Sequence, residues 1–261
     1  MIVNADDLGL TEGVTNGIIQ AATHGIVTST SAMMNHLTIG ADIARVREAC
    51  PRLGIGVHLV LTEGRPLLAP DLVPGLVNEN GRFHKFNRER ERIAGLDLGQ
   101  VHAEWRTQIE SFLGSGFQPD HLDSHHHISY FHPNLFKILL ELAREYHLPI
   151  RYPPSEFFAI LGKGNIDGWL VDYGVTTPFG CITDFYGYDR EINSGFLLGI
   201  LESMPDGVHE LMCHPGYAKQ DLINSSSYNK PRELELEVLT SPEVKGWIRD
   251  QGIQLIPFLN I

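Results

Sequence analysis

Cysteine is scarce in this chain of 261 residues, which has only Cys50, Cys181 and Cys213. The three cysteines are far apart, their number is odd, and no CxxC pair occurs. This spacing argues against a disulfide framework and against a zinc site built from cysteines. The first residues also lack the basic segment and apolar core of a signal peptide. We therefore expect a cytoplasmic protein.

Positive charge and long apolar runs are lacking as well. Lys and Arg number 20 against 32 Asp and Glu, a net charge of −12, whereas a nucleic-acid-binding protein needs a basic surface. The longest apolar runs, such as residues 196–201, are far too short to cross a bilayer. With 43% hydrophobic and 20% charged residues, the composition is that of a globular protein. We expect neither a nucleic-acid partner nor a membrane partner.

Short apolar segments alternate with segments of helical periodicity along the chain. We expect about seven strands, at 2–7, 26–34, 54–61, 120–127, 149–152, 209–213 and 253–258. Helices are expected at 11–25, at 39–46 before Pro51, at 97–112, from Pro133 through Leu142, at 193–204, at 234–239 and from Ser241. This alternation predicts an α/β fold with a mostly parallel sheet, either a barrel or doubly wound. No G-x-G-x-x-G follows the first strand, which argues against a dinucleotide-binding fold.

Two stretches fit no regular element. Residues 62–96 contain several prolines and no clear periodicity, and residues 153–190 are rich in glycine, proline and aromatic residues. Irregular stretches of this length in compact domains are often functional lids. We expect a single domain over 1–261, with the insertion at about 62–96 covering the mouth of a site or contributing to a subunit contact.

Polar side chains gather where the expected strands end. Asp6 and Asp7 end the first strand, His58 lies in the third, Arg151 ends the fifth and His214 follows the sixth. In a parallel barrel the carboxyl ends of all strands open on one face, where active sites are built. Pro215 and Gly216 end the sixth strand at once and aim His214 at that rim. The sequence therefore predicts a polar site on this face.

The segment HLDSHHH at 121–127 holds four of the thirteen histidines. If it is a strand, its period of two places His121, Asp123, His125 and His127 on one face and His126 on the other. Imidazole and carboxylate groups together form a ligand set for a divalent metal. The alternative is a surface histidine tract or a few hydrogen-bonded core histidines. We predict a metal site.

Adjacent carboxylates such as Asp6 and Asp7 can divide two tasks between them, although such pairs also cap helices or lie in solvated turns. One can bind a metal ion while the other takes a proton from the attacking water. Arg151 can orient Asp6 or balance its charge; otherwise it is an ordinary surface arginine.

Five segments resemble the YdjC-like carbohydrate deacetylases, in particular the chitooligosaccharide (chitin disaccharide) deacetylases: VNADDLGL at 3–10, GIVTST at 25–30, GVHLVLT at 56–62, HLDSHHH at 121–127 and MCHPGY at 212–217. The similarity keeps this order from the first residue to about residue 240. The resemblance implies a distorted (β/α) barrel. It also implies hydrolysis of the N-acetyl group of an acetylated amino sugar with one divalent metal ion, usually Mg²⁺.

The resemblance further implies Asp7, His58 and His125 as metal ligands, Asp6 as catalytic base and His214 as general acid. Apart from the resemblance, Arg151 is counted with the catalytic residues because it can orient Asp6. His127 stays open as a substitute ligand because it shares the expected face of His125. Two histidine ligands suit Zn²⁺, Mn²⁺ or Co²⁺ chemically better than Mg²⁺, so the metal also stays open.

The expected substrate is a small acetylated amino sugar, above all a chitooligosaccharide such as diacetylchitobiose or its phosphate, and the products are acetate and a free amine. The same residues would serve a hydrolase of an O-acetyl ester or a phosphoester. A non-catalytic sugar-binding protein would keep the ligands without needing Asp6 and His214, and a 2-His-1-carboxylate oxygenase shares the ligand count. Sugar chain length, substrate phosphorylation and assembly as a homodimer stay open.

Overall fold

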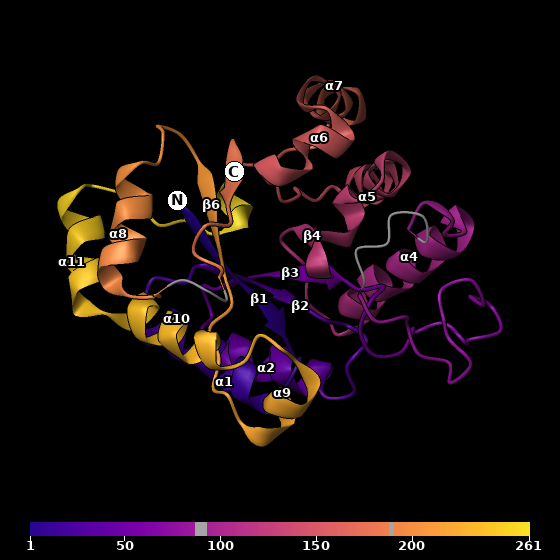
Figure 1. Cartoon of the computed structure of the whole chain (residues 1–261), viewed down its shortest axis with the longest axis horizontal. Coiled ribbons are helices and arrows are strands. Elements are labelled where there is room, and N and C mark those ends of the chain that lie inside the picture. The colour runs from indigo at the N-terminus through magenta and orange to yellow at the C-terminus, as the bar shows by residue number, and fades with distance from the viewer. Residues whose placement is uncertain (87–92, 188–190) are drawn as a thin grey trace.

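The computed structural model describes residues 1–86, 93–187 and 191–261, so positions 87–92 of the expected insertion and 188–190 lie outside the described residues. At its centre is a sheet of six parallel strands in the order β4-β3-β2-β1-β6-β5 (Figure 1). The strands are β1 (Ile2–Leu8), β2 (Ser29–Ala32), β3 (Gly54–Leu59), β4 (Leu122–Ser124), β5 (Gly180–Ile182) and β6 (His209–Cys213). The sheet curls into a half-barrel, which confirms the expected α/β barrel-type fold.

Helices surround this sheet (Figure 1). They are α1 (Glu12–His24), α2 (Ile39–Ala49), α4 (Leu98–Gly114), α5 (Pro133–Tyr146), α6 (Phe158–Leu161), α7 (Lys163–Tyr173), α8 (Ser194–Glu202), α9 (Gln220–Ser225), α10 (Lys230–Thr240) and α11 (Pro242–Asp250), with short 3₁₀ helices η1 (His125–Tyr130), η2 (Ser155–Phe157) and η3 (Phe258–Asn260). Helix α1 packs against β1, α2 and α10, while α4 packs against β3 and α5. No described helix is both long and apolar enough to span a membrane.

Local sequence signals explain several of these boundaries. The Thr11 side chain accepts a hydrogen bond from the Val14 amide and caps α1, as the sequence predicts. Pro133 occupies the first turn of α5, where its missing N–H costs nothing. Strand β1 is buried along its whole length, as expected for a central strand of a parallel sheet covered on both sides. Because β1 lies between β2 and β6 in the sheet, its carboxyl end brings Asp6 and Asp7 between the ends of these two strands.

The expectation of seven strands is wrong in two places within the described chain. Residues 149–152 form only one bridge to β4, at Leu122 and Ile150, and residues 253–258 form no strand. Prolines at 149, 153 and 257 remove backbone donors that a ladder would need. The short strand β5 lies instead within the stretch 153–190 that fits no element by pattern.

The segment 120–127 is also shorter as a strand than expected. Strand β4 ends at Ser124, and η1 begins at His125, with His126 and His127 in the left-handed region at φ 56° and 55°. The Ser124 hydroxyl accepts the Ser129 amide hydrogen bond and thereby closes this turn. The expectation that His121, Asp123, His125 and His127 share one strand face is therefore wrong, because the alternation of side chains stops at His125.

Candidate metal centre and active site

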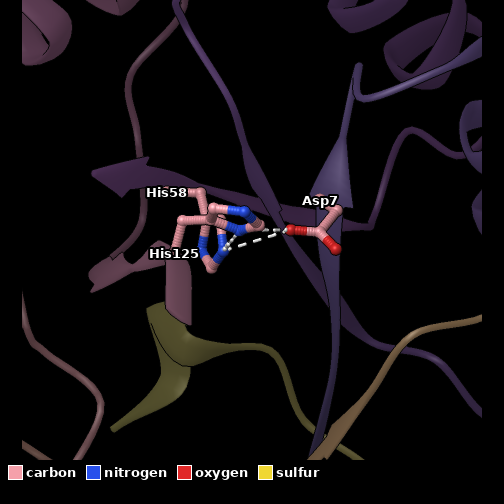
Figure 2. A group of neighbouring side chains, drawn as sticks. All are labelled: Asp7, His58 and His125. Atoms are coloured by element: carbon pink, nitrogen blue, oxygen red, sulfur yellow. Dashed lines mark hydrogen bonds and ion pairs between the residues drawn. The ribbon is translucent and has the colours of Figure 1, made fainter. Parts of the chain in front are cut away.

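Three buried side chains meet at the barrel mouth: Asp7 at the end of β1, His58 in β3 and His125 at the start of η1 (Figure 2). Asp7 Oδ1 lies 2.9 Å from His125 Nδ1 and 3.3 Å from His58 Nε2. The two ring nitrogens are themselves 3.3 Å apart. One oxygen and two nitrogens thus form a nearly regular triangle.

An irregularity in β1 brings Asp7 into this triangle. The register between β1 and β2 shifts between Ala5 and Leu8, and Asp7 has a φ of 72°. A non-glycine residue in this region costs about 1–3 kcal/mol, and such strain is concentrated at functional sites. Because of this bend, the adjacent carboxylates of Asp6 and Asp7 reach different partners at the same strand end.

The triangle fits a divalent cation. Asp7 Oδ1 is buried and accepts no well-aligned hydrogen bond among the described residues; the nitrogens of His125 and His58 face it, so a cation between the three would take the place of a proton on an imidazole. At metal–ligand distances of about 2.1 Å, neighbouring ligand atoms lie about 3.0 Å apart in an octahedral site and about 3.4 Å apart in a tetrahedral one. The observed separations of 2.9–3.3 Å are compatible with both geometries.

A second layer of polar contacts fixes the orientation of these ligands. Asp123 Oδ1 lies 2.7 Å from His58 Nδ1, and Ser31 donates a hydrogen bond to Asp123 Oδ2 at 2.9 Å. Arg232 donates to Asp7 Oδ2 at 2.6 Å. His58 and Asp7 thus each have one atom held by a neighbouring side chain and another turned toward the triangle, the usual arrangement around a bound metal.

The same contacts set the charges of the ligands. Burial alone would lower the pKa of His58, but the carboxylates of Asp123, Asp7 and Asp6 together outweigh burial and raise that pKa to about 10. Burial alone would raise the pKa of Asp7, but His125 and Arg232 outweigh it and hold that pKa well below its ordinary value. A cation entering the triangle therefore competes with a proton at His58 and meets an ionised Asp7.

Arg151 is fully buried among three carboxylates that come from β1, β4 and β6. It donates two hydrogen bonds to Asp6, at 2.8 and 2.6 Å, and one to Glu210 at 2.8 Å, and it lies 3.0 Å from Asp123. Burial would raise the pKa of Asp6, yet the Arg151 guanidinium outweighs it and holds that pKa well below its usual range. Arg151 is therefore not a surface arginine: it orients Asp6 and keeps it ionised.

His214 follows β6 and faces Asp6 from the other side. Its Nε2 lies 3.9 Å from Asp6 Oδ2, and its ring lies close to the rings of Tyr186 and Tyr228. Burial lowers the pKa of His214 to about 4. The His214 amide donates a hydrogen bond of 2.5 Å to Glu235.

The other two histidines of η1 point to different places. The His126 ring stacks on Phe86 and lies 2.9 Å from the Thr62 hydroxyl. His127 packs against Tyr130 and belongs to neither Asp/His group that the described residues offer to a metal. The second of these groups, Asp6 with His58 and Asp123, already has its two carboxylates paired with Arg151. Among the described residues, the triangle of Asp7, His58 and His125 is the better metal site.

A cavity of about 720 Å³ opens over these groups. The insertion contributes Thr62, Glu63, Lys85 and Phe86 to its wall, and the stretch 153–190 contributes Glu156, Phe157, Thr183, Asp184 and Tyr186. All three ligands of the triangle line the cavity, together with Asp6 and His214. A space of this size, with aromatic and polar walls, is typical of sites for small organic ligands.

Sequence reasoning missed three buried charged residues of this site, Glu210, Arg232 and Glu235. Glu210 had a detectable signal, because an acidic residue within a short apolar strand needs a buried cation. Arg232 and Glu235 had none, because many surface helices carry charges three residues apart. Only the docking of α10 against the site reveals them.

Comparisons with known proteins agree along the whole chain. The family described as YdjC-like protein matches residues 1–250. A protein of Brevibacillus brevis named carbohydrate deacetylase is 38% identical over 100% of this chain and 99% of its own. A protein of Yersinia pestis named chitooligosaccharide deacetylase is 36% identical over 100% of this chain and 98% of its own.

Solved structures agree with the fold. An Enterococcus faecalis protein, provisionally described as a cellobiose-phosphate cleavage protein, is 37% identical and superposes with a TM-score of 0.89, covering 99% of this chain and 97% of its own. The Xyl-CE4 domain of a xylanase from the hindgut metagenome of Trinervitermes trinervoides has a TM-score of 0.50 at 10% identity, covering 98% of this chain and 85% of its own, and shares the fold alone. With the family match over residues 1–250 and relatives above 30% identity along the full length, this chain belongs to the YdjC-like family.

Proposed function

We propose that this protein is a metal-dependent carbohydrate deacetylase that hydrolyses the N-acetyl group of a chitooligosaccharide such as diacetylchitobiose or its phosphate. The observation that carries the proposal is the triangle of Asp7, His58 and His125 at the floor of a cavity, with Asp6 and His214 beside it. The names of the full-length relatives support the same reaction class. In this proposal residues 1–261 act as one catalytic domain, and the insertion forms part of the cavity wall.

Asp7, His58 and His125 would hold one divalent cation, with Asp7 Oδ1 and one nitrogen of each imidazole as ligand atoms. When bound, such an ion supplies Lewis acidity to the attacking water and to the amide carbonyl. Two imidazole donors favour Zn²⁺ or Mn²⁺ over the Mg²⁺ that the resemblance implies. His127 lies outside this triangle and packs against Tyr130, so it would replace His125 as a ligand only by turning toward the triangle.

Asp6 and His214 would divide the two proton transfers. Asp6, ionised and held by Arg151, accepts a proton from the water that attacks the acetyl carbon. Asp6 passes this proton to the neutral imidazole of His214, whose Nε2 lies 3.9 Å from Asp6 Oδ2 and would have to approach it, and His214 gives the proton to the leaving nitrogen as the C–N bond breaks. The net change is one water consumed, one acetate formed and one amine freed, with both side chains restored.

Acetate release from defined sugars tests this proposal. The metal-loaded protein is incubated separately with N,N′-diacetylchitobiose, its phosphate, an O-acetylated sugar and a phosphoester, and the products are weighed by mass spectrometry. We expect loss of one acetyl group from an acetamido substrate and retention of any phosphate. Hydrolysis of the ester or the phosphoester with the N-acetyl sugars left intact would refute the proposal. Binding of the sugar without any turnover would instead indicate a sugar-binding protein.

A further inference from the structure

Helix α10 reaches the site with two buried charged side chains that no step above uses. Arg232 and Glu235 lie three residues apart on α10, so they share one face of the helix. Arg232 is 3% exposed and Glu235 is fully buried. Buried charges are expensive unless they have partners, so these two require an explanation.

Arg232 contacts the metal ligand of β1. Its Nη2 donates to Asp7 Oδ2 at 2.6 Å, while its Nε donates to the Tyr228 carbonyl at 2.9 Å. The Arg232 carbonyl also accepts a hydrogen bond from Gly216, two residues after His214. The guanidinium thus occupies one oxygen of Asp7 and leaves Oδ1 facing the two imidazoles.

Glu235 contacts the general acid through the main chain. Its Oε2 accepts the amide hydrogen of His214, and its Oε1 accepts the hydroxyl of Tyr228. The imidazole of His214 is not part of this contact. Glu235 therefore fixes the backbone position from which the His214 ring reaches toward Asp6.

We propose that Arg232 and Glu235 are positioning residues for the two halves of the site: Arg232 holds the Asp7 carboxylate in its metal-binding orientation, and Glu235 holds His214 at its distance from Asp6. This inference rests on the proposed function for the role of His214. The proposed role of Arg232 rests only on the metal site. A single helix near the carboxyl end of the chain thereby aligns groups that come from β1 and from the end of β6.

The sign of the metal-affinity change tests the role of Arg232. As a nearby positive charge, Arg232 repels a cation, so a purely electrostatic role predicts tighter binding after its removal. A positioning role predicts weaker binding, because Asp7, already in a strained backbone conformation, loses the anchor of its carboxylate. Loss of a residue that orients a ligand typically weakens metal binding by about 10- to 100-fold.

The affinity of Arg232→Met for Zn²⁺ and Mn²⁺ is measured by competition with a chromophoric chelator, without substrate. We expect a 10- to 100-fold loss relative to wild type and no further loss when the change is added to Asp7→Asn. Arg249→Met on α11, which removes an exposed arginine paired with Asp250, is the matched control. The proposed role of Arg232 would be overturned if the variant bound metal as tightly as the wild type or more tightly. It would also be overturned if the change lowered metal affinity by the same factor in the Asp7→Asn background. Arg232→Lys, which keeps the charge but not the two-sided contact, should show an intermediate loss if the Met variant does not fold.

Steady-state kinetics test the role of Glu235. Glu235→Met keeps roughly the size of the side chain but removes both acceptor oxygens, so the His214 amide loses its partner and His214 shifts. We expect kcat to fall by roughly 10- to 100-fold, the scale of a misplacement of about 1 Å, with KM and metal affinity unchanged. In a His214→Ala background the same change should have no further effect on kcat. Glu237→Met, at an exposed position of the same helix, is the control.

These outcomes separate the inference from the proposed function. A wild-type protein that binds metal but releases no acetate would refute the proposed function, while the metal affinities still decide the role of Arg232. An active wild type in which Glu235→Met lowers kcat equally with and without His214 would overturn the positioning role of Glu235.

Discussion

Replacing Arg151 by Met removes the cation buried among three carboxylates while nearly preserving volume. The change leaves Asp6, Asp123 and Glu210 buried around an apolar side chain. Removing one partner of a buried ion pair costs about 3–5 kcal/mol of the free energy of unfolding. For a domain of this size that corresponds to a fall in Tm of roughly 6–20 °C, at about 2–4 °C per kcal/mol.

The loss of stability caused by Arg151→Met should depend on pH. In the wild type, Arg151 holds the pKa of Asp6 below the ordinary 3.8, so the stability from ionised Asp6 is present above that pH and is lost only below it. In the variant, burial is no longer opposed by Arg151 and raises the pKa of Asp6. Its folded state then gains stability as the pH falls and the carboxylates take up protons. The difference between the two proteins is therefore largest near neutral pH and shrinks toward about pH 4.

Urea unfolding followed by circular dichroism between pH 4 and 8 measures this difference. Arg249→Met, which breaks an exposed ion pair with Asp250, is the control and should leave stability unchanged. If Arg151→Met lowered the free energy of unfolding by less than about 1 kcal/mol, and by the same amount across the pH range, Arg151 would not be the residue that balances the buried carboxylates of the site.

Three further predictions address the ligands, the insertion and α10. His125→Ala should lower metal content by elemental analysis, and full occupancy would bring His127 into the ligand set. Limited proteolysis within 62–86 should slow when a substrate analogue binds, since Thr62, Lys85 and Phe86 line the cavity; unchanged cleavage despite binding would contradict a covering role. Burial raises the pKa of Glu235 from 4.5 to about 7, so its folded state keeps a proton that the unfolded chain releases, and its destabilising effect grows from about pH 4.5 to about pH 7. Glu235→Gln should remove that part of the pH dependence in urea unfolding, whereas an unaltered slope would argue against it.

The position of the site could be predicted from the sequence because parallel strands present their carboxyl ends together. Asp6, Asp7 and His58 belong to strands whose residue types and spacing are clear, and the structure brings them to one mouth. The division of ligands from proton-transfer groups came from the family resemblance, since spacing alone did not show which aspartate would bind the metal. The bend at Asp7 that separates them is a backbone feature without a sequence signal.

The features of the site and the fold that could not be predicted from the sequence depend on long-range packing. The direction of His126 and His127 follows from the turn closed by Ser124 and Ser129, which a repeat of two along HLDSHHH cannot reveal. The role of α10 depends on which of its faces packs against the site. The sequence of residues 230–240 by itself does not show which face that is. Strand β5 is only three residues long and gains its order from pairing with β6.

Metal stoichiometry and turnover, measured side by side in Asp6→Asn and Asp7→Asn, decide whether the two aspartates have different roles. Asn keeps the shape of Asp and one oxygen but cannot act as a base. Asp6→Asn should bind metal nearly as the wild type does and lose about 10²- to 10⁴-fold in rate, the usual contribution of a general base. Asp7→Asn should lose metal affinity, and excess metal should partly restore its activity. If Asp6→Asn loses the metal while Asp7→Asn keeps it, the assignment is reversed; if Asp6→Asn turns over normally with metal bound, Asp6 is not the base.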